Sequence, residues 1–186
     1  MEQNSTIYVI RHGEASSNEP DAPLTEDGQK QAQQLAEFLS RITNIENSRL
    51  ISSPYLRASK TAEIVAARIN QTFSKDKRLQ ERNIGDYQGD NLFEDLKKHF
   101  SDTNHRFPNG ESNGEVRVRA TSLIDEIRHD NQHPTFLFTH RLTMMILFNH
   151  YDQNWDFDKG VSITNPDVYE LQFVDERPSI RRVWNV

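Results

Sequence analysis

Short apolar runs alternate with longer amphipathic stretches along the 186-residue chain. Residues 7–10 and 135–139 carry few polar side chains, which is typical of strands buried on both faces of a sheet. Residues 168–174 alternate between apolar and polar positions. With a turn at 175–178 and a second strand at 180–184, this alternation predicts a hairpin at the edge of a sheet.

Helical periodicity fills the intervals between these strands and a shorter strand expected at residues 50–51. Thr25 and Ser53 are predicted to cap two of the helices, with Pro54 at the first helical position. Strands that alternate with helices predict an α/β fold with a mostly parallel sheet, and we expect one domain over residues 1–186. The apolar helical faces comprise Ala32, Leu35, Ala36, Leu39 and Ile42; Ala58, Thr61, Val65 and Ile69; Phe93, Leu96 and Phe100; Val116, Ala120, Leu123, Ile124 and Ile127; and Leu142, Met145 and Ile146.

Composition narrows the class of partner. The net charge is -6, which argues against binding to nucleic acid or to an anionic membrane, because both require a basic surface. No apolar run approaches the length of a membrane span, and residues 1–6 lack the apolar region of a signal peptide, so we expect a cytoplasmic protein. The absence of cysteine excludes disulfides, thiolate nucleophiles and cysteine-based zinc sites.

Candidate chemistry lies where the predicted strands end. His12 follows one strand beside Arg11, His140 follows another, and a third strand ends just before a helix that carries Arg57. Taken singly, each histidine is better interpreted as structural and the helical arginine as solvated. Because the carboxyl ends of parallel strands share one edge of a sheet, we expect the three segments to meet. An imidazole among guanidinium groups favours an anionic ligand, and phosphate suits the bidentate geometry of arginine.

Six blocks of sequence surround these residues in order. They are Arg11-His12-Gly13-Glu14 with Asn18; Leu24-Thr25 with Gly28 and Gln31-Ala32; Ser52-Ser53-Pro54 with Arg57-Ala58 and Thr61-Ala62; Leu79-Gln80-Glu81-Arg82 with Gly85 and Gly89; Gly110-Glu111-Ser112; and Thr139-His140. Together they resemble the histidine phosphatase superfamily, which includes the cofactor-dependent phosphoglycerate mutases. The resemblance covers most of the chain and implies a three-layer α/β/α fold.

The resemblance also implies roles for individual residues. His12 would attack phosphorus and become a phosphohistidine, and Glu81 would act as general acid and then as general base. The phosphoryl oxygens would be held by Arg11, Asn18, Arg57 and His140. No cofactor and no metal are required. The remaining histidines are interpreted as surface or structural residues: His99, His105, His129, His133 and His150.

Departures from the family pattern favour a phosphatase. Ile84 stands where the mutases usually carry a substrate-contacting tyrosine, and the chain lacks their arginine pair for the substrate carboxylate. Arg141 replaces the glycine that commonly follows the second histidine, so it could crowd the pocket, add a phosphate or substrate contact, or point away. Glu111 and Ser112 could line the substrate side or cap a helix.

Three interpretations therefore compete: a metal-independent phosphomonoesterase, a phosphoglycerate mutase-type transferase, and an inactive phosphate-binding domain. Specificity is expected to depend on a substrate-side segment around residues 82–113, which carries no interpretable motif. The substrate, whether a small phosphorylated metabolite or a phosphoprotein, is left open, and so is the oligomeric state.

Overall fold

The computed structural model of the protein describes residues 5–42, 45–128, 133–174 and 177–185. Within these residues six strands form one sheet in the order β3-β2-β4-β1-β5-β6. The strands from β1 to β4 run parallel, whereas β5 is antiparallel to β1 and β6 is antiparallel to β5. The strands are β1 (Ser5–Arg11), β2 (Arg49–Ser52), β3 (Ser74–Lys75), β4 (Thr135–Thr139), β5 (Asp167–Phe173) and β6 (Pro178–Arg182). The predicted α/β fold with a mostly parallel sheet is confirmed.

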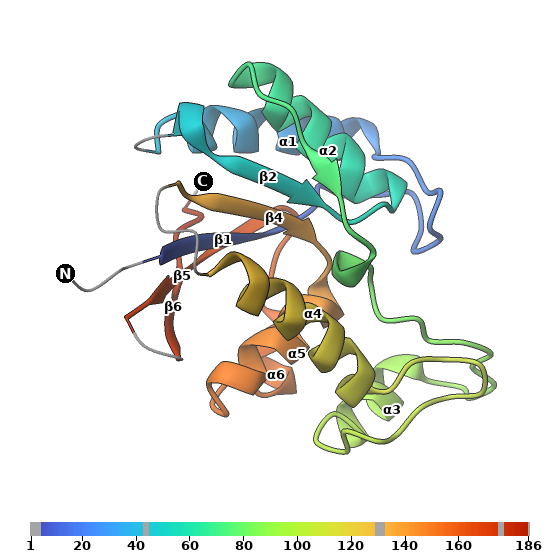
Figure 1. Cartoon of the computed structure of the whole chain (residues 1–186). Coiled ribbons are helices and arrows are strands. Elements are labelled where there is room, and N and C mark those ends of the chain that lie inside the picture. The colour runs from blue at the N-terminus through green and yellow to red at the C-terminus, as the bar shows by residue number, and fades with distance from the viewer. Residues whose placement is uncertain (1–4, 43–44, 129–132, 175–176, 186) are drawn as a thin grey trace.

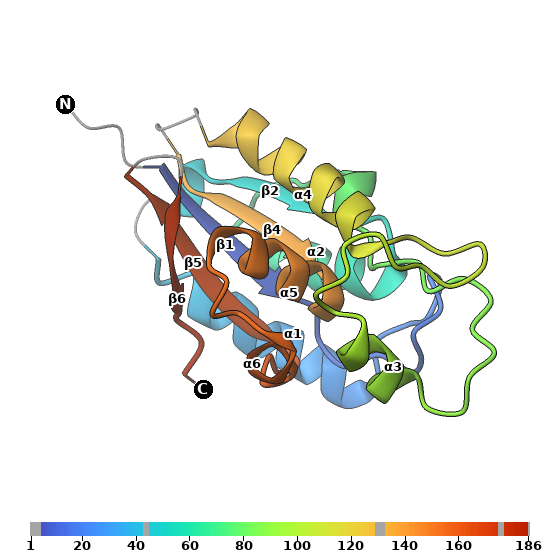
Figure 2. The same ribbon diagram turned by 90° about the horizontal axis from the view of Figure 1, so that it is seen from below.

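Helices cover both faces of the sheet (Figures 1 and 2). One face packs against α1 (Glu26–Leu39) and α2 (Leu56–Arg68). The other packs against α4 (Asn113–Ile127), α5 (Arg141–Tyr151) and α6 (Phe157–Val161). The short helix α3 (Leu92–Lys98) lies beyond the carboxyl ends of the parallel strands. None of the helices in the described ranges is long and apolar enough to cross a membrane.

The strand residues alternate between two cores, which explains the layers. In β1, Tyr8 and Ile10 are buried with α1 and α2, whereas Ile7 and Val9 are buried with α4 and α5. Burying one such side chain contributes about 1.5–3 kcal/mol, so a strand that is apolar on both faces stabilises both helical layers. The expected three-layer arrangement is therefore present.

Most of the predicted elements form, with instructive exceptions. Thr25 caps α1 by accepting a hydrogen bond from the backbone N–H of Gly28 at 2.9 Å. Ser53 does not cap α2: the helix begins at Leu56, and the Ser53 hydroxyl is held by other partners described below. Phe93 is 44% exposed rather than packed with the other predicted face residues of its helix.

The β5–β6 hairpin places β6 at the edge, as predicted, and two short elements, β3 and α6, had no strong sequence signal. The turn predicted at 175–178 lies partly outside the described residues. The α4 helix begins at Asn113, because Ser112 and Glu115 form a reciprocal capping box. Of the two possibilities for Ser112, the structure therefore shows the cap.

The carboxyl ends of β1, β2 and β4 lie side by side in the sheet. The backbone N–H of Ser53 donates to the Phe138 carbonyl at 2.8 Å, and that of His12 donates to the Thr139 carbonyl at 3.3 Å. His140 is the next residue, directly before α5. The pairing of β1 and β2 with the central strand β4 therefore brings together the three segments that carry the candidate chemistry.

The segment 82–113 extends beyond these carboxyl ends as two long loops joined by α3 (Figure 1). Its ends are held together by backbone hydrogen bonds from Asp86 to Pro108 at 2.7 Å and from Glu111 to Asn83 at 2.8 Å. Gly85 has a φ of 71° and packs against the backbone of Gly110, so a side chain there would both strain the backbone and clash.

Candidate active site

His12 is buried, with 6% of its surface exposed, and both ring nitrogens have partners. Nδ1 lies 2.6 Å from the carbonyl oxygen of Gly13, and Nε2 accepts a hydrogen bond from Arg57 Nε at 3.1 Å. Because a carbonyl only accepts, we assign the ring proton to Nδ1. The lone pair then lies on Nε2, the nitrogen that faces the guanidinium group. His12 is thus oriented as a neutral imidazole whose Nε2 lone pair points at the Arg57 guanidinium group.

The electrostatics agree with this neutral state. Burial lowers the pKa of His12 to about 3, and the positive charges of Arg57 and Arg11 act in the same direction, although the Gly13 carbonyl opposes them. Burial also lowers the pKa of His140 well below its ordinary value, with His12 and Arg57 contributing. Both histidines therefore remain uncharged at neutral pH.

The loop that carries His12 is held from several sides. Asn165 donates to the His12 carbonyl at 2.8 Å, and Thr61 of α2 accepts from the backbone of Gly13 at 3.2 Å. Gly13 also packs directly against the backbone of Gly28, where a Cβ would clash. The sequence analysis did not anticipate Asn165, which lies 153 residues from His12.

Arg57 is 2% exposed, which overturns its isolated interpretation as a solvated helix residue. Besides its bond to His12, it donates to the Glu19 carbonyl at 2.7 Å and stacks over the Tyr55 ring with a guanidinium-to-centroid distance of 5.3 Å. These contacts hold the guanidinium in one orientation at Nε2 of His12. Such a preorganised cation is suited to oxygens that gain negative charge during a reaction.

His140 is fully buried, and its ring centroid lies 5.0 Å from that of His12. Its Nε2 lies 2.8 Å from the Ser53 hydroxyl, which itself accepts from the Tyr55 backbone at 3.2 Å. Its Nδ1 is buried and has no partner among the described residues. The sequence analysis placed Ser53 near the site but predicted that its hydroxyl caps α2, whereas the hydroxyl contacts His140.

Glu81 is held at the N-terminus of α5. Its Oε1 accepts from the backbone of Arg82 at 2.9 Å and from the backbone and hydroxyl of Thr143 at 3.0 and 3.1 Å. Its Oε2 accepts only from the backbone of Leu142, at 3.1 Å, so this oxygen has more room for a proton. The charge of Glu81 acts on Arg11 and Arg57, which places the carboxylate within electrostatic range of the pocket.

Arg11 and Arg141 form the more open part of the site. Arg11 donates to the Ile163 carbonyl at 2.7 Å, and its buried Nε has no partner among the described residues. Burial lowers the pKa of Arg11 to about 10, and the charge of Arg141 is the next largest cause. Arg141 is half-buried and makes no hydrogen bond or ion pair within the described part of the chain. Its charge therefore lies within electrostatic range of Arg11.

The structure brings most of the predicted site residues together, but Asn18 stands apart. The site contains His12, Arg57, Glu81, His140, Arg11 and Arg141. Asn18 is exposed and makes no hydrogen bond within the described ranges, although its neighbour Glu19 contacts Arg57. Its expected phosphate contact stays a prediction.

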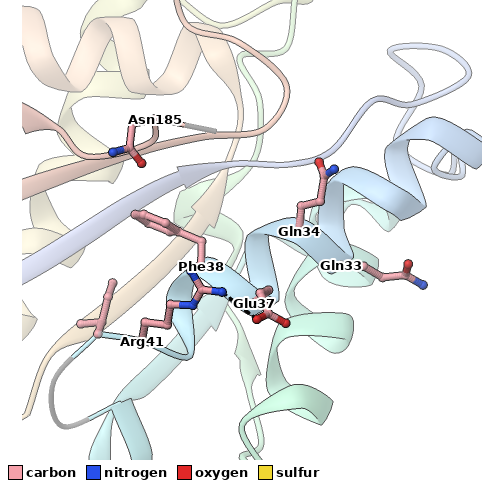
Figure 3. Close-up of a pocket in the computed structure, with 7 residues that line it drawn as sticks. Gln33, Gln34, Glu37, Phe38, Arg41 and Asn185 are labelled. Carbon is pink, nitrogen blue, oxygen red and sulfur yellow. Dashed lines mark hydrogen bonds and ion pairs between the residues drawn. The ribbon is translucent and has the colours of Figure 1, made fainter.

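A hollow of about 660 Å³ lies at the C-terminal end of α1, away from His12 (Figure 3). It carries no histidine, and its two opposite charges, Glu37 and Arg41, form an exposed ion pair at 2.9 Å. Its carboxylate, that of Glu37, is engaged by Arg41 at the surface, so this hollow offers no cluster of cations for a phosphate. The lining residues are Gln33, Gln34, Glu37, Phe38, Arg41, Ile42 and Asn185.

Of the other histidines, His133 and His150 are exposed, and His129 lies outside the described residues. His99 and His105 lie next to Asp102 in a group that sequence analysis did not detect. The regular spacing of three residues between them is the signal that could have revealed it.

The comparison with protein families agrees with this geometry. A model of the histidine phosphatase superfamily (branch 1) matches residues 7–186. The chain belongs to this superfamily. A Hydrogenobacter thermophilus protein named "Putative phosphoserine phosphatase 2" is 28% identical and matches over 74% of this chain and 74% of its own length. An Escherichia coli protein named "Probable phosphoglycerate mutase GpmB" is 30% identical over 66% of this chain and 62% of its own length.

Solved structures show the same fold. A phosphoglycerate mutase from Bacillus anthracis superposes with a TM-score of 0.80 at 21% identity, over 98% of this chain and 93% of the other. A mycobacterial glucosyl-3-phosphoglycerate phosphatase superposes with a TM-score of 0.73 at 22% identity, over 98% and 99%. Phosphatases and mutases thus occur together among the similar proteins, and membership of the family does not separate the two activities.

Proposed function

We propose that this protein is a phosphatase that hydrolyses phosphomonoesters through a phosphohistidine on His12. The observation that carries the proposal is the fixed, neutral His12, whose Nε2 lone pair faces Arg57 while its Nδ1 donates to a backbone carbonyl. A nucleophile that is already deprotonated needs no base for attack. Phosphoryl transfer depends mainly on positioning and on electrostatic stabilisation, which a pocket of arginine and histidine donors supplies.

In the proposed first step, Nε2 of His12 forms a bond to phosphorus as the ester P–O bond breaks. Glu81 passes a proton from Oε2 to the departing alkoxide. In the second step, water attacks phosphorus and gives a proton to Glu81, while the P–Nε2 bond breaks, the electron pair returns to His12 and inorganic phosphate is released. Arg11, Arg57 and His140 would bind the phosphoryl oxygens in both steps, so that the charge is stabilised by side chains and no metal is required.

Arg141 supports a narrower substrate class. Its half-buried charge has no counter-charge within the described residues and lies in electrostatic range of Arg11. A second anionic group on the substrate would relieve this repulsion and gain a charge-assisted hydrogen bond. The substrate proposed is therefore a phosphomonoester that carries a further negative charge, and segment 82–113 would line its non-phosphate part.

Rapid quench with a labelled phosphomonoester tests the intermediate. The expected product is acid-labile, base-stable phosphate on His12, which is absent in His12→Ala. Label on His140, or full turnover by His12→Ala, would exclude the proposed nucleophile. Activity is expected to persist after exhaustive chelation and to be blocked by vanadate, which resembles the five-coordinate transition state. Loss of turnover on chelation, restored by a divalent ion, would exclude the metal-free mechanism.

The E. coli relative supports a second candidate, a mutase that passes the phosphoryl group to another hydroxyl instead of water. Ile84 counts against it, because this side chain packs against the hydrophobic core where a mutase is expected to carry a polar substrate contact. Product analysis with 3-phosphoglycerate separates the two: release of phosphate supports the phosphatase, and appearance of 2-phosphoglycerate supports the mutase. The absence of any turnover across a panel of phosphomonoesters would leave the inactive binding domain.

A further inference from the structure

Two histidines and an aspartate gather outside the catalytic pocket, where α3 ends. His99 is the C-terminal cap residue of α3, and Asp102 and His105 follow at intervals of three. Two backbone hydrogen bonds coil this turn, from Asp102 to the His99 carbonyl at 3.1 Å and from His105 to the Asp102 carbonyl at 3.2 Å. As a result, one nitrogen or oxygen atom of each side chain lies within 4.8 Å of the other two.

One ring nitrogen of this group, Nε2 of His105, is buried without a hydrogen-bond partner among the described residues. The rings of His99 and His105 stack face to face, with centroids 3.7 Å apart and planes 6° apart. Asp102 accepts a hydrogen bond from the Asn104 backbone on Oδ1 at 3.0 Å, and Oδ2 has no partner in the described chain. Buried nitrogens without a hydrogen-bond partner are rare in folded proteins, so the one in His105 favours a ligand.

We propose that His99, Asp102 and His105 bind one divalent transition-metal ion of the zinc class. Two imidazole nitrogens and one carboxylate oxygen match the preference of zinc and its neighbours, whereas magnesium and calcium favour oxygen ligands alone. Three protein ligands leave a fourth position for water. This site is separate from the phosphate pocket, and it does not depend on the proposed phosphatase activity.

Binding requires a defined local rearrangement. Bonds of about 2.0–2.2 Å to a tetrahedral ion bring the ligand atoms to roughly 3.4 Å from one another, closer than the present limit of 4.8 Å. Stacked parallel rings also direct their lone pairs along parallel lines that do not converge on one ion. At least one imidazole must therefore tilt out of the stack, while the exposed Asp102 side chain closes from the solvent side.

The charges around the turn set the expected strength of binding. Arg82 disfavours a cation at His105, whereas Asp95 and Asp102 favour one. Arg82 also donates to the His105 carbonyl at 3.4 Å, and its own backbone N–H bonds to Glu81. The opposing arginine and the open fourth position predict weaker binding than at a closed structural zinc site. A metal ion would tie the end of α3 to the segment anchored next to Glu81.

Cobalt titration of the full chain at pH 7.5, followed by visible absorption, tests this site directly. The expected result is ligand-field absorption that saturates at one equivalent and is displaced by zinc. Asp102→Asn and His105→Gln should each weaken binding by roughly tenfold or more, since loss of even an outer-shell partner costs that much. His133→Gln, which changes an exposed histidine elsewhere, is the matched control.

A second control addresses the catalytic histidines, whose rings lie close enough to attract a metal themselves. His12→Ala should leave the cobalt spectrum and its stoichiometry unchanged. Loss of the signal in this variant, unchanged binding in Asp102→Asn, or the absence of saturable binding in the wild type would each overturn the proposal. Because Asp102 is exposed, its variant should keep the wild-type melting temperature without metal, and only the metal-induced rise should shrink.

Discussion

Truncation of Arg57 to alanine is the sharpest test of the site, because Arg57 is the side chain that donates a hydrogen bond to the proposed attacking nitrogen, Nε2 of His12. Arg57→Ala removes the Nε donor 3.1 Å from His12 Nε2 and the bond that ties the guanidinium to the Glu19 carbonyl. If Arg57 binds the transferring phosphoryl group, the transition state loses a preorganised, charge-assisted donor in a buried setting.

The expected loss follows from comparable donors. Removing one preorganised donor costs about 2.7–4 kcal/mol, which corresponds to roughly 100- to 1,000-fold in kcat. Arg57→Lys should fall between the wild type and Arg57→Ala, because an ammonium keeps the charge but lacks the planar fork that reaches His12 and Glu19 together. Arg57→Ala should also move the acid limb of kcat/KM to higher pH, since one positive charge that lowers the pKa of His12 is gone.

Steady-state hydrolysis of an aryl phosphate at 25 °C, with kcat and KM measured across pH, gives both readouts. Arg68→Ala is the matched control, because Arg68 lies at the other end of the same helix in an exposed ion pair with Glu37. Its kcat should stay close to the wild-type value. A melting curve for each variant separates unfolding from loss of catalysis. A folded Arg57→Ala enzyme with near wild-type kcat/KM would refute the assignment of Arg57 to the phosphoryl group.

Three further expectations follow from the site. Glu81→Gln should slow hydrolysis of an alkyl phosphate by roughly 100-fold or more and hydrolysis of an activated aryl phosphate far less, because the aryl leaving group needs no proton from an acid. Equal decreases in the steady-state rates of both substrates would remove Glu81 from this role. Arg141→Gly should raise KM about tenfold or more for a doubly anionic substrate and leave a simple aryl phosphate unchanged, whereas improved turnover of both would mean that Arg141 obstructs the pocket. Denaturant unfolding should show that the free energy of unfolding decreases in acid. Folding lowers the pKa of His12 to about 3, so the unfolded chain takes up the proton first as the pH falls. The stability that is present above about pH 6.5 is therefore lost as the pH falls toward 3. His12 alone contributes about 2 kcal/mol to this loss at pH 5, and a His12→Asn variant with the same acid sensitivity as the wild type would contradict the assignment.

The residues of the site were largely predictable from the sequence because their signals are local. An apolar run that ends in Arg11 and His12 marks a buried strand and the chemistry at its end, and helical spacing marks the face of α2 that Arg57 borders. Strand type, most of the helix faces and the cap at Thr25 depend on neighbours a few residues away, and the structure confirms them, with Phe93 as an exception. The family blocks added the roles proposed for Glu81 and His140.

Partners far apart in the sequence were decided only by the tertiary structure. Serine is a residue type that often caps helices, and the sequence predicted this role for Ser53. The pairing of β2 with β4 instead places Nε2 of His140 2.8 Å from the Ser53 hydroxyl, and this contact replaces the cap. The nearness of the Arg141 charge to Arg11 and the stacking of His99 on His105 likewise depend on packing between elements. Sequence patterns report which surface an element buries, because burial follows a local period. They do not report which side chain meets it from another element, because that depends on strand order and on the closing of loops around the sheet.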